Sequence, residues 1–223
     1  MRLDYMAHSC FLLEQRGYRV LFDPYDPCIG YPAPRLTGVD LMVVSHDHHD
    51  HNGTSQIAGA SQVVRGIARR EYGPLVVDGE VGWHSHGSDA DPVALTLLEW
   101  DGRRLAHFGD LGCELEVSQV ERFKGLDLLL IPVGGGYTID GPKAAQIVKK
   151  LRPRIAVPMH YQTPFLDRLQ FPNFQTAEPF LQACREFGTV EMVRDGWVDL
   201  DTIWAQDSDN ALTRVIHLQH QMA

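Results

Sequence analysis

Several short runs rich in apolar residues lie on either side of turn residues, as the two strands of a β-hairpin do. Residues 10–22 contain two such runs around a Gln15-Arg16-Gly17 turn, which predicts a β-hairpin. Residues 93–108 contain two more around Asp101-Gly102, a dipeptide typical of tight hairpin turns. The first half of the chain is therefore predicted to be rich in antiparallel β-structure.

Other segments are apolar almost throughout, which is typical of strands buried on both faces. This pattern covers residues 39–45, 126–133 and 155–159. Weaker strand candidates cover residues 61–64, 74–77 and 80–83.

Helical periodicity is clearest over residues 140–151, which open with Asp-Gly-Pro and end before Pro153. Ala144, Ile147, Val148 and Leu151 share one face of that helix. Further helices are expected over residues 113–123 and 176–187.

After Trp204 the pattern fades, and we expect a loop or an extension there. Strands come first, and strands and helices then alternate, without a repeat or a linker. This order predicts a single α/β domain over residues 1–223.

Composition narrows the class of protein. The 223 residues are 44% hydrophobic and carry a formal net charge of −9, which disfavours nucleic acid as a partner. Four dispersed cysteines and the lack of a signal-like or long apolar segment favour a reduced, cytoplasmic setting without membrane insertion. We therefore expect a small-molecule substrate, and homo-oligomers remain open.

Histidines are concentrated directly after the strand predicted at residues 39–45. Of the eleven in the chain, four lie within six residues, at His46, His48, His49 and His51, with Asp50 among them. An extended or turning backbone at a strand exit lets side chains two residues apart face one site. Imidazole nitrogens and carboxylate oxygens are ligands that suit zinc and its first-row neighbours.

Further candidate ligands follow other predicted strands. Asp110 lies in a Gly-Asp-Leu-Gly stretch, and His160 ends the strand at residues 155–159. His84 and His86 both follow the weak strand at residues 80–83. We expect His86 to be the ligand and His84 to face solvent.

The candidate ligands form the series His-x-His-x-Asp-His, a later His, Gly-Asp, and a His that closes a late strand. This series resembles the metal-ligand motifs of the metallo-β-lactamase superfamily. Two features resemble the small cytosolic branch of this superfamily, which includes L-ascorbate-6-phosphate lactonase. They are Asp110, at a position where antibiotic-cleaving members use Cys, and the Gly134-Gly135-Gly136 stretch. The resemblance implies a four-layer αββα sandwich. It also implies two metal ions, one held by His46, His48 and His86, the other by Asp50, His51 and His160, with Asp110 bridging them.

The same resemblance implies a hydrolase in which a metal-bridging hydroxide attacks an ester, lactone or phosphoester, with Asp50 handling the proton. Zinc is the first candidate for both ions, and manganese or iron would also fit. Two alternatives stay open: a phosphodiesterase or nuclease acting on nucleotides or RNA, and a non-hydrolytic di-iron redox enzyme.

Other histidines and one aspartate lie near these motifs. Asp47 is a candidate hydrogen-bond partner of a metal-bound imidazole. We expect His49 to be a loop residue, His107 to be structural, and His217 and His220 to be tail residues without a role. His8 is either a core histidine or a residue near the substrate. Gly134–Gly136 is either a plain turn or a backbone site for an anion.

Overall fold

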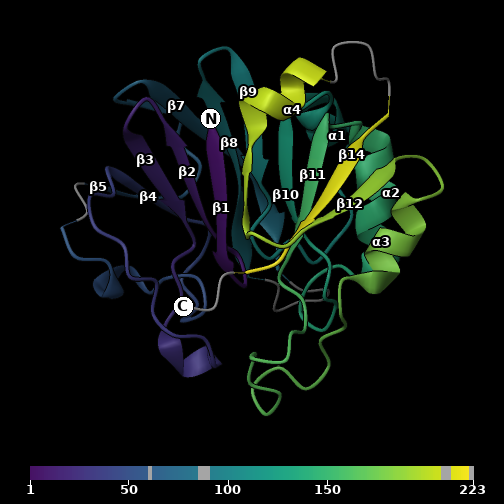
Figure 1. Cartoon of the computed structure of the whole chain (residues 1–223), viewed down its shortest axis with the longest axis horizontal. Helices are drawn as coiled ribbons and strands as arrows, with labels where there is room; N and C mark the ends of the chain where they lie inside the picture. The colour runs from purple at the N-terminus through teal and green to yellow at the C-terminus, as the bar shows by residue number, and fades with distance from the viewer. Residues whose placement is uncertain (60–61, 85–90, 207–211, 221–223) are drawn as a thin grey trace.

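Two β-sheets lie face to face at the centre of the molecule, and helices α1, α2 and α3 lie together at one side (Figure 1). The structure is a computed structural model that describes residues 1–59, 62–84, 91–206 and 212–220. The mixed α/β arrangement with two central sheets confirms the predicted fold class.

The first sheet has six strands in the order β13-β1-β2-β3-β4-β5. Neighbours from β13 to β3 are antiparallel, whereas β3, β4 and β5 run parallel. The strands are β1 (Arg2–Ala7), β2 (Cys10–Gln15), β3 (Tyr18–Phe22), β4 (Leu41–Val44), β5 (Gln62–Arg65) and β13 (Trp197–Asp199).

The second sheet has eight strands in the order β12-β14-β11-β10-β9-β8-β7-β6. It is antiparallel from β6 to β9 and parallel from β9 to β12. The strands are β6 (Arg70–Tyr72), β7 (Leu75–Trp83), β8 (Pro92–Trp100), β9 (Arg103–His107), β10 (Leu128–Pro132), β11 (Ile155–Met159), β12 (Thr189–Val193) and β14 (Arg214–Leu218).

The helices are short, and the longest, α2, has 11 residues. They are α1 (Val117–Phe123), α2 (Gly141–Leu151), α3 (Glu178–Cys184) and α4 (Leu200–Gln206), with 3-10 turns η1 (Pro27–Ile29) and η2 (Thr54–Gln56). None of the helices in the described ranges has both the length and the apolar character needed to cross a membrane.

Strand alternation divides the apolar residues of the six-stranded sheet between two cores. Phe11, Leu13 and Phe22 face the second sheet in the main core, while Leu12 and Leu21 face outward. The outward residues pack under loops that include Tyr31 and Phe171 rather than under a long α-helix. Pro27, Pro32 and Pro34 account for this, because proline disfavours helix interiors.

Most elements lie where the sequence predicts them, including both hairpins, β4, β10, β11 and α2. The expectation of a loop or extension after Trp204 is wrong, because Arg214–Leu218 forms β14. That strand lies inside the eight-stranded sheet, between β11 and β12. Five residues are too few for a clear pattern, and parallel neighbours on both sides fix this segment as a strand.

Candidate metal centre

Four strands end at one edge of the two sheets, and each is followed by a candidate ligand. β4 leads into His46, β7 into His84, β9 into Asp110 and β11 into His160. A hydrogen bond from the Ala94 amide to the Ser45 carbonyl, of 2.9 Å, connects the two sheets beside this edge. The chain therefore delivers these side chains to one place from rigid β-structure.

One group consists of His46, His48 and His84, whose ligand atoms all lie within 4.8 Å of one another. The His46 Nε2 and His48 Nδ1 atoms are 2.9 Å apart. His46 and His84 are largely covered, whereas the His48 side chain is 41% exposed and forms the open side of the group.

A second group consists of His8, Asp50, His51 and His160, all buried. The Asp50 Oδ2 atom lies 3.0 Å from His8 Nε2, 3.5 Å from His51 Nε2 and 3.8 Å from His160 Nε2. This carboxylate is therefore surrounded by three imidazoles.

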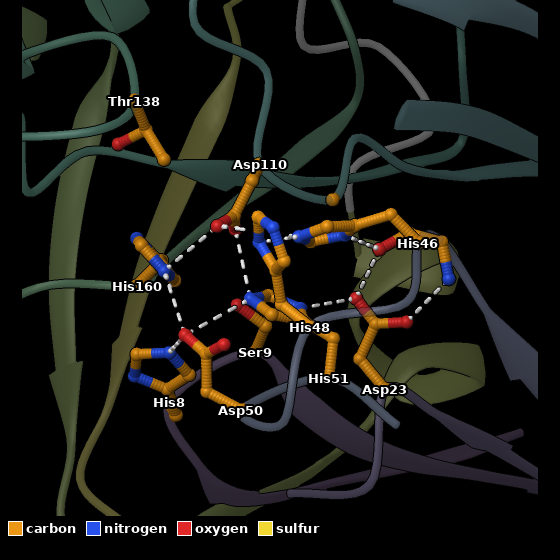
Figure 2. A network of polar contacts seen from close by, with 12 residues as sticks. His8, Ser9, Asp23, His46, His48, Asp50, His51, Asp110, Thr138 and His160 are labelled. Carbon is orange, nitrogen blue, oxygen red and sulfur yellow. Dashed lines mark hydrogen bonds and ion pairs between the residues drawn. The ribbon is translucent and has the colours of Figure 1, made fainter. Parts of the chain in front are cut away.

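Asp110 lies between the two groups, as Figure 2 shows. Its Oδ2 atom is 3.0 Å from His84 Nε2 and 3.1 Å from His160 Nε2. Its Oδ1 atom is 3.1 Å from His51 Nε2. One carboxylate thus contacts histidines of both groups.

The structure brings together six of the seven predicted ligands, namely His46, His48, Asp50, His51, Asp110 and His160. The seventh, His86, lies outside the described residues. The expectation that His84 faces solvent is wrong, because this residue is only 8% exposed. β7 runs up to Trp83, which points outward, and strand alternation turns the next side chain inward.

The buried polar atoms at this place fit a bound cation. His51 Nε2, Asp110 Oδ1 and His160 Nε2 are buried and lack a hydrogen-bond partner among the described residues. They nevertheless crowd together, and leaving such atoms unpaired costs about 1–3 kcal/mol each. Nitrogen and carboxylate oxygen are the donors that zinc and its neighbours accept, so the residues present suit a metal.

The electrostatics agree with a ligand role for these side chains. Burial and the nearby His51 lower the pKa of His46 to about 3, so its imidazole is neutral. Burial opposes ionisation of Asp110 and Asp50, but neighbouring histidines hold the pKa of each carboxyl well below its usual range. Although burial opposes it, Asp110 and Asp50 raise the pKa of His51 and His160, so these two imidazoles release a proton when they bind a metal ion.

Asp23 and Ser45 contact the candidate ligands, and the sequence did not single them out. The Asp23 Oδ2 atom accepts hydrogen bonds from His51 Nδ1 at 2.7 Å and from Ser45 Oγ at 2.6 Å. Ser45 Oγ in turn lies 2.9 Å from His46 Nδ1. The buried Asp23 carboxylate therefore orients His51 directly and His46 by way of Ser45. This leaves the Nε2 atom of one histidine in each group free to coordinate.

Backbone contacts fix the remaining residues near the centre. The Gly134 and Gly135 amides donate to the carbonyls of His160 and Ile139, so these two N–H groups serve a turn and are not free for an anion. His107 lies between the Ser9 carbonyl and the Gly109 amide, which agrees with the structural role predicted for it.

A cavity of about 250 Å³ opens onto the two groups. Aromatic and polar side chains form the wall away from the ligands. The lining residues are His48, His49, Asp50, His84, Asp110, Tyr137, His160, Gln170 and Phe171. The site therefore has room for a small molecule next to the candidate ligands.

Comparisons with known proteins agree with this geometry. The family model of the beta-lactamase superfamily domain matches residues 2–160. A UPF0173 metal-dependent hydrolase of Carboxydothermus hydrogenoformans is 27% identical over 195 residues, covering 73% of this chain and 85% of that protein. A UPF0173 protein of Pyrococcus furiosus is 35% identical over 184 residues, covering 73% of this chain and 84% of that protein.

Among solved structures, the chain is similar to a Thermotoga maritima protein provisionally named as a Zn-dependent hydrolase of the metallo-β-lactamase superfamily. The two are 26% identical with a TM-score of 0.73, and the match covers 97% of each chain.

Proposed function

This chain belongs to the metallo-β-lactamase superfamily and is a metal-dependent hydrolase, and from that premise we propose that it uses two divalent ions to hydrolyse an ester, lactone or phosphoester bond of a small molecule. The observation that carries the proposal is the position of Asp110. Its carboxylate contacts His84 on one side and His51 and His160 on the other, which suits a ligand shared by two ions.

The two groups divide the remaining ligands between the ions. His46, His48 and His84 hold one ion, and Asp50, His51 and His160 hold the other. His84 takes the place that the sequence favours for His86, because its imidazole lies beside those of His46 and His48. Zinc is the first choice of metal, which the name of the Thermotoga maritima relative supports, and manganese or iron would suit the same donors.

Two bound ions would activate water near neutral pH and polarise the substrate's electrophilic oxygen. The chain's own part in the reaction falls mainly to Asp50. Asp50 lines the cavity, and its carboxylate is the group placed to accept a proton and return it to the leaving group. Asp110 keeps the two groups at a fixed separation, and Asp23 keeps His51 in the tautomer that coordinates.

The proposal is tested by metal analysis of protein purified without chelator, followed by a substrate panel on the same preparation. We expect close to two ions per chain, and turnover of at least one among lactone, thioester and phosphodiester substrates. One ion per chain, or none, contradicts the dinuclear site.

The same metal measurement decides whether His84 or His86 is the ligand. His84→Ala should empty the position shared with His46 and His48, while His86→Ala should keep both ions. The reverse result would restore His86 as the ligand.

A further inference from the structure

His8 lies in the connection between β1 and β2 and contacts the centre without belonging to the proposed ligand set. Its side chain is completely buried, and its Nε2 atom lies 3.0 Å from Asp50 Oδ2. Of the three imidazoles around that oxygen, His8 is the nearest. Figure 2 shows its ring beside Asp50 and below His160, at the edge of the cluster.

We propose that His8 is a positioning residue whose Nε2–H donates to Asp50 Oδ2 and fixes the carboxylate for coordination and proton transfer. The inference rests on the proposed function, because it assigns to His8 the task of orienting a ligand that also moves the proton. Asp50 needs such a partner because it comes from the loop after β4 and not from a strand end.

The backbone of His8 is held in place from two sides. Its carbonyl accepts hydrogen bonds from the Tyr5 hydroxyl and from the His160 amide, each of 3.0 Å. Its φ of +55° lies in the left-handed region, which costs a non-glycine residue about 1 kcal/mol or more. This left-handed conformation and the hydrogen bond to the His160 amide together restrict the backbone of His8. The His8 ring therefore has little freedom to move relative to the site.

The surroundings of the ring identify His8 as a donor rather than a ligand. Its Nδ1 atom has no hydrogen-bond partner in the part of the chain that the structure describes. The ring lies near Phe171 and Phe174, with centroids 5.5 and 6.3 Å away. A metal-bound imidazole normally donates its other N–H to an acceptor, as His51 does to Asp23. His160 Nδ1 has no such acceptor among the described residues either, but His160 Nε2 lies near both Asp50 and Asp110, whereas His8 Nε2 lies near Asp50. A proton on Nε2, shared with Asp50, avoids burying an unpaired N–H.

Three substitutions separate the hydrogen bond from the backbone conformation. His8→Gln places an amide N–H near the position of the imidazole Nε2, so it can still reach Asp50. His8→Asn tolerates a positive φ better than glutamine, but its amide ends about where Nδ1 lies and falls short of Asp50. His8→Leu fills a similar volume without any polar group.

Zinc binding is measured on metal-free protein by competition with a chromophoric chelator, and melting temperature reports whether each variant folds. We expect His8→Gln to bind the zinc ion assigned to Asp50, His51 and His160 within a few-fold of wild type. His8→Asn and His8→Leu should weaken that ion about 10–100-fold, the usual effect of removing a partner of a metal ligand. The other ion should be unaffected.

Hydrolytic activity is a second test of the role of His8, with p-nitrophenyl acetate and bis-p-nitrophenyl phosphate as probe substrates. For whichever probe wild type hydrolyses, kcat should fall in the Asn and Leu variants and recover in the Gln variant. KM should change little, because His8 does not line the cavity.

Two results would overturn the role of His8. An Asn variant that equals or exceeds the Gln variant would mean that only the backbone conformation matters. Complete loss of one ion in all three variants would make His8 a ligand. Wild-type protein that binds neither zinc nor manganese nor iron would instead overturn the proposed function, and the role of His8 with it.

Discussion

Asp23 offers the sharpest test of how this centre is built, and we predict that Asp23→Asn weakens metal binding while leaving the fold intact. The residue is fully buried, and its carboxylate accepts from the Ser45 amide, Ser45 Oγ and His51 Nδ1. Its φ is +39°, a conformation that asparagine adopts more readily than most residues. The substitution therefore changes hydrogen bonding more than shape.

The consequence follows from the donors around the new amide. If its oxygen stays opposite the Ser45 amide, at 2.8 Å in the native protein, its NH₂ group replaces the oxygen that faces His51 Nδ1. His51 must then accept at Nδ1 and carry its proton on Nε2. That nitrogen lies 3.1 Å from Asp110 Oδ1, where it should be coordinating.

The expected loss is about 10–100-fold in metal affinity, which corresponds to about 1.4–2.8 kcal/mol. Chelator competition measures it on metal-free protein. Ser45→Ala is the matched control, because it removes the partner of His46 and leaves the bond between Asp23 and His51 in place. It should weaken only the ion that His46 holds. Asp23→Asn protein that binds both ions as wild type does would refute the tautomer argument.

Three further predictions follow from the same geometry. Asp50→Asn should lower kcat about 10²–10⁴-fold, more than it lowers metal content measured on the same preparation, because asparagine can coordinate weakly but cannot take the proton. Gly134→Ala should weaken metal binding and lower the melting temperature, since a Cβ there would lie 2.2 Å from the His160 carbonyl oxygen, whereas Gly102→Ala, whose Cβ meets no atom within 4 Å although its φ is +75°, should leave metal binding unchanged. Penicillins and carbapenems should be hydrolysed poorly, because Asp110 stands where antibiotic-cleaving members carry cysteine, and turnover at ordinary enzyme efficiency would contradict this.

Local pattern was enough to predict most of the residues that the structure brings together, because many of them follow strands. A buried apolar run followed by His46 and His48 fixes both the element and the side-chain direction, and the same holds for His160 after β11. Asp110 could be predicted for a similar reason, since the Asp101-Gly102 turn aligns the hairpin that leads to it. In each case sequence neighbours determine the geometry.

Contacts between residues far apart in the sequence left no such signal. Asp23 follows β3 and its carboxylate contacts His51, 28 residues away, and nothing in the local sequence distinguishes it from a loop aspartate. The choice between His84 and His86 depended on where β7 ends, and strand boundaries are the least certain feature of a sequence pattern. β14 depends on its two parallel neighbours, which only the assembled sheet provides.

The wall of the cavity is built separately from its metal ligands, and this separation bears on substrate choice. Gln170 and Phe171 come from a loop that is anchored on η1, through the Asp167 amide to the Ile29 carbonyl and Gln170 Nε2 to the Cys28 carbonyl. The two loops meet so closely that a Cβ on Gly30 would lie 2.3 Å from the Phe165 carbonyl oxygen. Because His46, His84, Asp110 and His160 follow strand ends and Asp50 and His51 belong to the loop after β4, whereas this wall consists of other loops, the wall can change without displacing the ligands. Substrate preference should therefore follow these two loops, whereas the sheets keep the metal chemistry constant.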